Sequence, residues 1–233
     1  MDDVSKLAAP LLLPAVLSVI AGSVDVISFL GLDGLFNAHI TGNLVIIAAH
    51  MVAGRAANTA LLLSVPIFIL VLALTNLLAG RLEWAGVSSL RPLLLLQFLL
   101  LTGFLTLCVA ERSRTVPNAT SVVVAGLLGV SAMAVQNALV QISLKGAPTT
   151  VLTTTITRFT VDAVEVLMIR KVADVTAARR RMKQGWPAIV GFTAGAGLGA
   201  ASFATAGLWS LLLPTAFALI ALAVSASSKL MRL

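Results

Sequence analysis

Charged residues are scarce in this chain. They make up 11% of its 233 residues, and the mean hydropathy is +1.04. A soluble domain of this length carries about 25% charged residues, which coat its surface. The composition therefore excludes a water-soluble globule and predicts an integral membrane protein. Its apolar runs have the length of transmembrane helices, about 20 residues, and helices satisfy the backbone hydrogen bonds that lipid cannot.

Cysteine and histidine are also rare. The single cysteine, Cys108, excludes an internal disulfide and a cysteine-based metal cluster, and its apolar surroundings predict a buried thiol. The two histidines, His39 and His50, would lie about 16 Å apart along a helix axis, too far to share one metal ion. No phosphate loop, nucleophile elbow or dinucleotide fingerprint occurs in the chain. We therefore predict no enzyme activity, no metal and no cofactor.

The charge balance is positive, with 16 Lys and Arg against 9 Asp and Glu. The cations cluster at the ends of apolar runs, as in the stretch 179–183, RRRMK. This pattern is typical of cytoplasmic loops and of contact with anionic lipid, and we expect no nucleic-acid partner. Both termini are predicted to be cytoplasmic. The first apolar run, Leu11–Leu32, is too long for the core of a cleavable signal peptide.

The apolar runs predict an all-α, polytopic helix bundle that forms a single transmembrane domain over residues 1–233. Six runs are clear spans: Leu11–Leu32, Ala60–Leu78, Pro92–Val109, Ser121–Leu144, Pro187–Ala206 and Leu208–Ser225. Two further segments begin with polar residues and are long enough for a tilted span: Leu35–Ala53 and Val151–Ile169. Charge counting does not decide between six and eight spans, because the cytoplasmic side carries most of the cations in both arrangements.

An internal repeat favours eight spans. When residues 23–43 are placed over residues 135–155, at a constant offset of 112, Asp25 meets Asn137 and the Thr41–Asn43 segment meets Thr153–Thr155. The predicted pseudo-repeats are residues 1–115 and 116–233, each with about four helices. Four spans per half would make the repeats parallel and three would invert them, and both arrangements occur in transporters.

Two motifs resemble the YoaK family of bacterial multi-spanning membrane proteins. The first is AGSVDVISFLGL followed by FNAHITGNLVIIAA, and the second is QNALVQ followed by TTVLTTTITR. In the second motif, Thr154-Thr155 stands where the family has Gly-Thr or Gly-Asn, so that half departs from the family pattern. The resemblance implies a multi-pass protein of the bacterial inner membrane with a domain of unknown function. It supplies no activity.

Asp25 lies near the middle of the first predicted span. A charge at the bilayer centre costs at least about 2.5 kcal/mol, so an intramembrane acid indicates a functional site. Asp25 can serve as a proton or cation site, or it can lock two helices through a hydrogen bond. Asn137, at the equivalent place in the repeat, is the predicted partner.

Three charged residues of the second polar segment share one helix face, because Arg158, Asp162 and Glu165 recur at spacings of four and three. Thr155 joins the same stripe. If this helix spans the membrane, the stripe faces the protein interior, and Arg158 pairs with Asp162. If the helix lies on the membrane surface, the stripe is a solvated face.

The segment NAHITGN begins the first polar helix with Asn37, His39, Thr41 and Asn43. A helix start inside a membrane protein presents N–H groups and a positive dipole end, which can bind a solute. Thr and Asn are also common N-caps, so ordinary capping is the structural alternative. His39 is a candidate for a proton-linked step, because histidine is the side chain suited to such steps at physiological pH.

A glycine motif in the seventh predicted span places Gly191, Gly195 and Gly199 on one face. Small residues at this spacing allow close helix packing, within the chain or in a homodimer. We predict a transporter or permease for a small solute, with proton coupling through Asp25 or Asp162. The alternative is a structural or regulatory membrane subunit that acts through helix contacts. The predicted partners are the lipid bilayer, the solute and a second copy of the chain.

Overall fold

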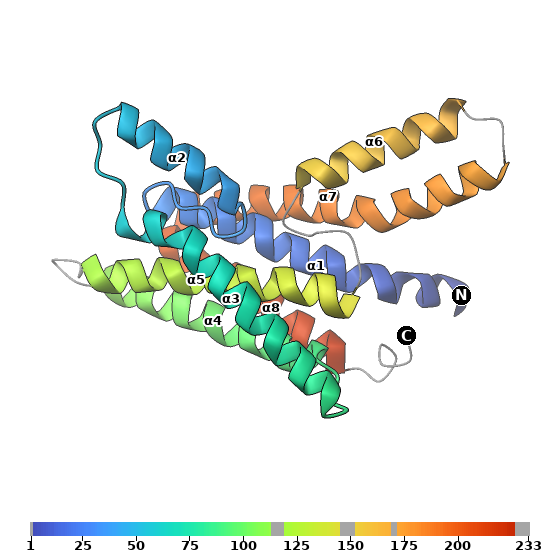
Figure 1. The fold of residues 1–233 in the computed structure, drawn as a ribbon, viewed down its shortest axis with the longest axis horizontal. Coiled ribbons are helices and arrows are strands. Elements are labelled where there is room, and N and C mark those ends of the chain that lie inside the picture. The colour runs from blue at the N-terminus through green and yellow to red at the C-terminus, as the bar shows by residue number, and fades with distance from the viewer. Residues whose placement is uncertain (1, 113–118, 145–151, 169–171, 227–233) are drawn as a thin grey trace.

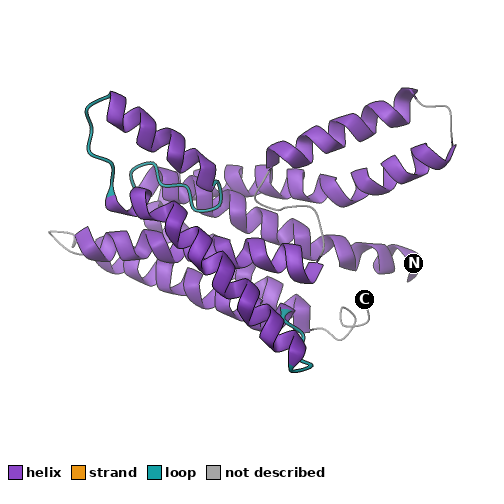
Figure 2. Cartoon of the chain, viewed as in Figure 1, coloured by secondary structure: helices purple, strands orange, loops and turns teal. Residues whose placement is uncertain are grey.

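The protein folds as an all-α bundle (Figures 1 and 2). The computed structural model describes residues 2–112, 119–144, 152–168 and 172–226, and these residues form helices and short connections with no strand. The predicted fold class, a helix bundle, is confirmed. The chain order of the elements is α1 (Asp2–Gly31), α2 (Ile40–Val52), α3 (Thr59–Trp84), α4 (Leu90–Arg112), α5 (Ala119–Leu139), η1 (Val140–Leu144), α6 (Leu152–Met168), α7 (Val172–Ala206), η2 (Gly207–Leu211) and α8 (Leu212–Ala226).

Five helical stretches in the described chain are long and apolar enough to cross a membrane. They are Leu12–Gly31, Thr59–Trp84, Leu90–Glu111, Thr120–Leu144 and Val175–Ser225. The last stretch has 51 residues, far more than the roughly 20 that one span needs. Gly207 adopts φ 59° within it, a left-handed conformation that glycine tolerates, and the chain turns back there so that α8 packs on α1 and α4.

The two segments that begin with polar residues form two of the three shortest α-helices; the third is α8. Helix α2 has 13 residues and α6 has 17, and only α2 is apolar enough to count as a membrane helix fragment. A helix of 13 residues is about 20 Å long, which is less than the hydrocarbon core of about 30 Å. Helix α2 therefore does not cross the membrane by itself.

Apolar side chains cover both the core and the outside of the bundle. The core is filled by large side chains such as Leu17, Leu101, Phe104 and Met133. The outer face of α3 is equally apolar, and Leu77 there is 66% exposed. A helix that is apolar all round fits a membrane, because the lipid covers the face that the protein does not.

The contacts between helices come in pairs that are related by exchanging α1–α4 with α5–α8. Helix α1 packs along α7, as α3 packs along α5. Helix α4 packs on α5, as α8 packs on α1, and α2 packs on α3, as α6 packs on α7. Exchanging α1–α4 with α5–α8 leaves this set of contacts unchanged.

The colour ramp in Figure 1 gives the direction of each helix. Helix α1 runs from the right of that view to the left, and α5 runs the opposite way. The same reversal holds between α2 and α6, between α3 and α7, and between α4 and α8. Helix α1 begins and α8 ends at the same end of the bundle.

The glycine motif of α7 packs against α1 of the same chain. A Cβ on Gly195 would press on the backbone of Val19, and a Cβ on Gly199 would lie 2.9 Å from the Ser23 Cα. Gly22 of α1 approaches the α7 backbone at Phe192 in the same way. The close packing expected for this motif is thus used within the chain and is not left for a second copy.

Candidate functional site

A loop between α1 and α2, residues 32–39, re-enters the bundle. Its side chains Leu35, Asn37 and Ala38 are buried, and Asn37 is fully inaccessible. The loop packs on α5 at two glycines: a Cβ on Gly126 would lie 2.7 Å from Leu35, and a Cβ on Gly129 would clash with the Asn37 side chain. Since lipid offers no hydrogen bonds, backbone that leaves a helix at this depth needs partners from the protein.

Asp25 of α1 supplies those partners. Its Oδ1 accepts hydrogen bonds from the backbone N–H groups of Asn37 (2.9 Å) and Ala38 (2.6 Å), and its Oδ2 accepts one from His39 (3.0 Å). Asp25 is 3% exposed, so these contacts replace its solvation. The three donors precede the first turn of α2, where the helix dipole also favours a negative group. Asp25 therefore anchors the loop and fixes the start of α2.

Asn43, in the first turn of α2, holds the same loop from the other side. Its Oδ1 accepts from the Phe36 N–H (2.9 Å), and its Nδ2 donates to the Phe36 carbonyl (2.8 Å). The Nδ2 also donates to Ser64 Oγ on α3 (2.9 Å). One buried amide thus pairs with both polar atoms of a loop residue and ties α2 to α3.

The predicted residues of NAHITGN divide into two groups. Asn37 and Asn43 point inward, and Asn37 Nδ2 donates to Ser28 Oγ at 2.7 Å. His39 and Thr41 are exposed. The N-cap position of α2 is His39, whose side chain makes no capping hydrogen bond, so neither Thr41 nor Asn43 caps the helix. The buried amides and Asp25 instead bind the loop itself.

The Asn137 side chain, predicted to partner Asp25, donates from Nδ2 to the Met133 carbonyl one turn earlier on α5 (3.0 Å). The hydrogen bonds to Asp25 come from the loop backbone instead. The sequence could not reveal these donors, because every residue except proline carries a backbone N–H.

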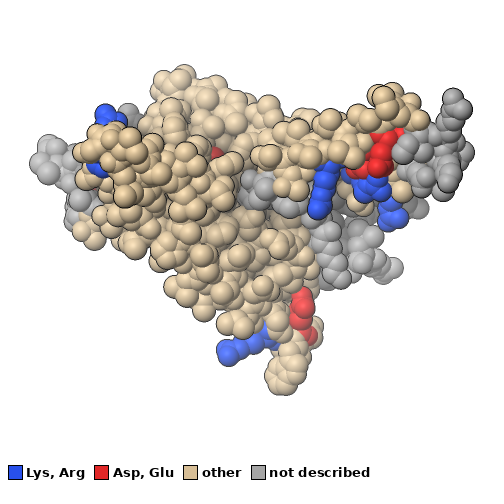
Figure 3. All heavy atoms as spheres, turned by 45° about the horizontal axis from the view of Figure 1, so that its top comes forward, with Lys and Arg blue, Asp and Glu red and all other residues tan. Residues whose placement is uncertain are grey.

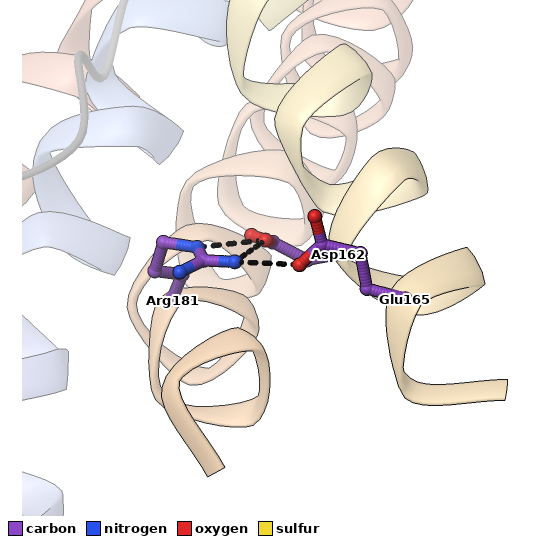
Figure 4. A network of polar contacts seen from close by, with 3 residues as sticks. All are labelled: Asp162, Glu165 and Arg181. Atoms are coloured by element: carbon purple, nitrogen blue, oxygen red, sulfur yellow. Dashed lines mark hydrogen bonds and ion pairs between the residues drawn. The ribbon is translucent and has the colours of Figure 1, made fainter. Parts of the chain in front are cut away.

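The charged stripe of α6 binds α7. Arg181 donates from Nε to Asp162 Oδ1 (2.7 Å) and from an Nη to Glu165 Oε2 (2.9 Å), as Figure 4 shows. The predicted pairing of Asp162 with Arg158 is wrong, because α7 runs back along α6 and brings Arg181 to the acids, whereas Arg158 is exposed. The basic run 179–183 is the sequence signal for this contact. Thr155, on the same stripe, is buried and faces Gly185 of α7.

The contact of Arg181 with Asp162 and Glu165 joins α6 to the first half of α7, whereas Asp25 and Asn43 hold the loop at the start of α2. In Figure 1, α2 and α6 begin towards the middle of the molecule and diverge from there. One site assembled from both halves, from Asp25 to Arg158, stays a prediction.

A pair of buried glutamines was missed by the sequence analysis. Gln97 of α4 donates from Nε2 to Gln136 Oε1 of α5 (2.7 Å), and Gln136 donates from Nε2 to the Leu17 carbonyl of α1 (2.8 Å). Both side chains have no exposed surface. The signal was a lone amide in an apolar run, PLLLLQFLLL, since polar residues inside spans are costly and tend to face the protein interior.

The helices and their buried polar contacts define a multi-pass helical membrane protein. The family model of DUF1275, described as a protein of unknown function, matches residues 13–224, and the chain belongs to this family. The predicted membership of a family with a domain of unknown function is confirmed at that level. The likeness to YoaK proteins rests on the two motifs alone. No curated protein and no solved structure matches the chain.

Proposed function

We propose that this protein transports a small solute across the membrane and that it is built from two inverted repeats, α1–α4 and α5–α8. Six helices cross the bilayer in this proposal, and α2 and α6 are the short helices of the two halves. The observation that carries the proposal is the loop 32–39, which interrupts helical structure inside the bundle. Transporters use such interruptions to expose polar groups at membrane depth.

The helix arrangement supports the inverted form of the repeat. Corresponding helices run in opposite directions (Figure 1), and the contacts are unchanged when the two halves are exchanged. The ends of α1 and α5 also match at the offset of 112 residues. Helix α5 ends in the π-helix Val140–Leu144, and the equivalent stretch 28–32 ends in a wide turn in which the Gly34 N–H donates to the Phe29 carbonyl.

The distribution of charge supports six crossings. Charged side chains gather at three edges of the face in Figure 3, at the upper left, at the right and at the bottom, and the surface between them is almost free of charge. Arg55 lies between α2 and α3 at one end, whereas Arg81 and Arg91 flank the connection from α3 to α4 at the other. The run 179–183 lies in the first half of α7, towards that second end. The positive-inside rule makes the second end cytoplasmic. We therefore place the beginning of α1 and the end of α8 in the cytoplasm, and the family resemblance favours a bacterial inner membrane.

The repeat supplies a mechanism for alternating access. Helices α1 and α7 are in close backbone contact at their glycines. The equivalent pair, α3 and α5, meets through side chains, where a Cβ on Gly126 would lie 3.5 Å from the Ala60 Cβ. When two halves of similar fold pack differently, each half can adopt the packing of the other. This change opens the central path to the opposite side of the membrane. Proton coupling is left out of the proposal, because Asp25 and Asp162 are both engaged in hydrogen bonds.

The structural-subunit alternative loses its main support. It relied on Gly191, Gly195 and Gly199 as a contact for a partner or a second copy, and on the basic loop as a second contact. All three press on the α1 backbone at Ala15, Val19 and Ser23. A partner would have to use another surface.

A disulfide across the α1–α7 seam tests the transport proposal. A Cβ on Gly199 would lie 3.3 Å from the Ser23 Cβ, close to the Cβ separation of disulfides, about 3.5–4.5 Å. The double variant Ser23→Cys/Gly199→Cys, with Cys108→Ala, is reconstituted in liposomes, and the entry of glycerol, urea, methylammonium and amino acids is followed by light scattering.

We expect at least one solute to enter faster than in protein-free liposomes, oxidation to stop this entry, and a reductant to restore it. The single variant Ser23→Cys with the same oxidant is the control. Equal entry with and without protein, or entry that the cross-link leaves unchanged, would contradict the proposal.

A further inference from the structure

Two buried side-chain oxygens have no hydrogen-bond donor within the described part of the chain. They are Gln97 Oε1 on α4 and Asn37 Oδ1 in the re-entrant loop, and both residues are fully inaccessible. A buried carbonyl oxygen without a donor costs about 1–3 kcal/mol, and in a membrane interior no solvent relieves it. Two such groups in one protein interior call for a bound species that donates hydrogen bonds.

The orientation of the Gln97 amide is fixed by its neighbours. The Leu17 carbonyl only accepts hydrogen bonds, so the group of Gln136 that faces it is the NH2, and Gln136 Oε1 is turned towards Gln97. Gln97 must then present its own NH2 to Gln136, and this leaves Gln97 Oε1 without a donor. If the oxygen and nitrogen of Gln97 were exchanged, its oxygen would face Gln136 Oε1, and two acceptors would oppose each other. The missing donor is therefore a property of the chain Leu17–Gln136–Gln97.

The second oxygen lies in the same part of the bundle. Asn37 packs on Gly129, which is two turns before Gln136 on α5, so the two amides are about 10 Å apart along that helix. Between them, α5 presents Val130–Val135 and α4 presents Phe98–Gly103, which hold no charged residue. The carboxyl of Asp25, which accepts from the Asn37 N–H, adds a negative group beside the loop. Acceptors next to an acid and without a nearby cation disfavour anions and fit a neutral or singly positive donor.

We propose that Gln97 Oε1 and Asn37 Oδ1 are two successive acceptors, about 10 Å apart along α5, for a small solute that carries N–H donors, such as an amine, an ammonium ion or urea. This inference rests on the proposed transport function and names the substrate class of its path. The chain of glutamines holds one acceptor in place, and the anchored loop holds the other. The hydrogen bond between Asn37 and Ser28 Oγ holds the Asn37 side chain against α1.

Thermal unfolding of the purified protein in detergent tests the binding step without transport. The probes are methylammonium chloride and urea, with sodium chloride at equal ionic strength and sodium formate as references. We expect a saturable rise of Tm with methylammonium or with low concentrations of urea, and none with formate beyond the sodium chloride baseline.

The variant Gln97→Met/Gln136→Met removes the acceptor oxygen of Gln97. Replacing both members of a buried hydrogen bond by apolar side chains of similar shape is close to neutral for stability, so this variant is expected to fold. We expect it to lose the Tm response or to need at least tenfold more ligand. Thr102→Val on α4, which removes a hydroxyl bonded within its own helix, is the control and keeps the response.

If the double variant does not fold, Gln97→Met alone takes its place. No rise of Tm with either probe, an equal rise with formate, or a response retained in the folded variant overturns the inference. Binding without uptake into liposomes would support the binding site and refute the transport proposal. Uptake, together with unchanged binding in the variant, would support transport and refute the binding site.

Discussion

The carboxyl group of Asp25 accepts a 2.6 Å hydrogen bond from the backbone N–H of Ala38, 13 residues later. This contact joins the last two turns of a long helix to a loop that has turned back into the bundle. An intramembrane acid is therefore used here to fix the backbone at the point where helical structure stops. The folding of the loop and the start of α2 depend on it.

Removing this acid should destabilise the protein. Asp25→Ala leaves the N–H groups of Asn37, Ala38 and His39 without their acceptor, at about 1–3 kcal/mol for each donor that stays buried. We expect a loss of at least about 3 kcal/mol, seen as a large fall of Tm in detergent. Asp33→Asn is the control, because Asp33 is exposed at φ 55° and Asn tolerates that conformation. Equal Tm values for the two variants would refute the anchoring role.

Substitutions in the first turn of α2 should destabilise the protein when they remove a buried side chain and have little effect when they remove an exposed one. Asn43→Leu removes three buried hydrogen bonds, to both polar atoms of Phe36 and to Ser64, and should lower the free energy of unfolding by about 2 kcal/mol or more. Thr41→Ala, on the exposed side of the same turn, should change it by less than about 0.5 kcal/mol. Denaturation in detergent measures both. A larger effect at Thr41 than at Asn43 would show that the segment works through its outer face.

Two glycines of α7 should respond oppositely to alanine. A Cβ on Gly195 would press on the Val19 backbone, so Gly195→Ala should cost about 1–3 kcal/mol through the displacement of α1. A Cβ on Gly197 would meet nothing within 4 Å, so Gly197→Ala should stabilise by up to about 1 kcal/mol through helix propensity. Thermal unfolding of the two variants is the measurement. Similar shifts of Tm would mean that α1 and α7 are not in close contact.

The contact between α6 and α7 should depend on one arginine among its neighbours. Arg181→Gln removes the ion pairs to Asp162 and Glu165 and leaves the buried Asp162 carboxylate without its cation. We expect faster amide hydrogen exchange in α6. Arg180→Gln, next to it and exposed, should leave exchange in α6 unchanged. Protection of α6 that survives Arg181→Gln would show that apolar contacts alone hold this helix.

The sequence predicted the helices well, because their apolar runs are long and lipid allows few other structures. The polar contacts were harder to foresee. Asp25 binds backbone groups, which have no sequence signature, and Asp162 binds an arginine that is distant in sequence but brought close by the return of α7. The paired amides Gln97 and Gln136 were visible as isolated polar residues, yet only the packing of α4 on α5 shows that they meet.

The direction of the repeat depended on details that composition does not carry. The alignment of Asp25 with Asn137 gave the offset, but it favoured four spans per half. The length of α2, 13 residues, and the entry of its loop into the bundle favour three crossings per half. The segment Leu35–Ala53 therefore has the length of a full span in the sequence, whereas in the structure it is the end of a loop followed by the short helix α2.

The sidedness of two loops tests the inverted six-crossing topology most directly. In a Cys108→Ala background, single cysteines replace Ala56, exposed between α2 and α3, and Ser88, exposed between α3 and α4. Intact cells are treated with a membrane-impermeant thiol reagent, and lysed cells show the total label. We predict that Ala56→Cys is labelled in intact cells and that Ser88→Cys is labelled only after lysis. The reverse pattern would mean eight crossings with parallel repeats, and it would contradict the inverted architecture.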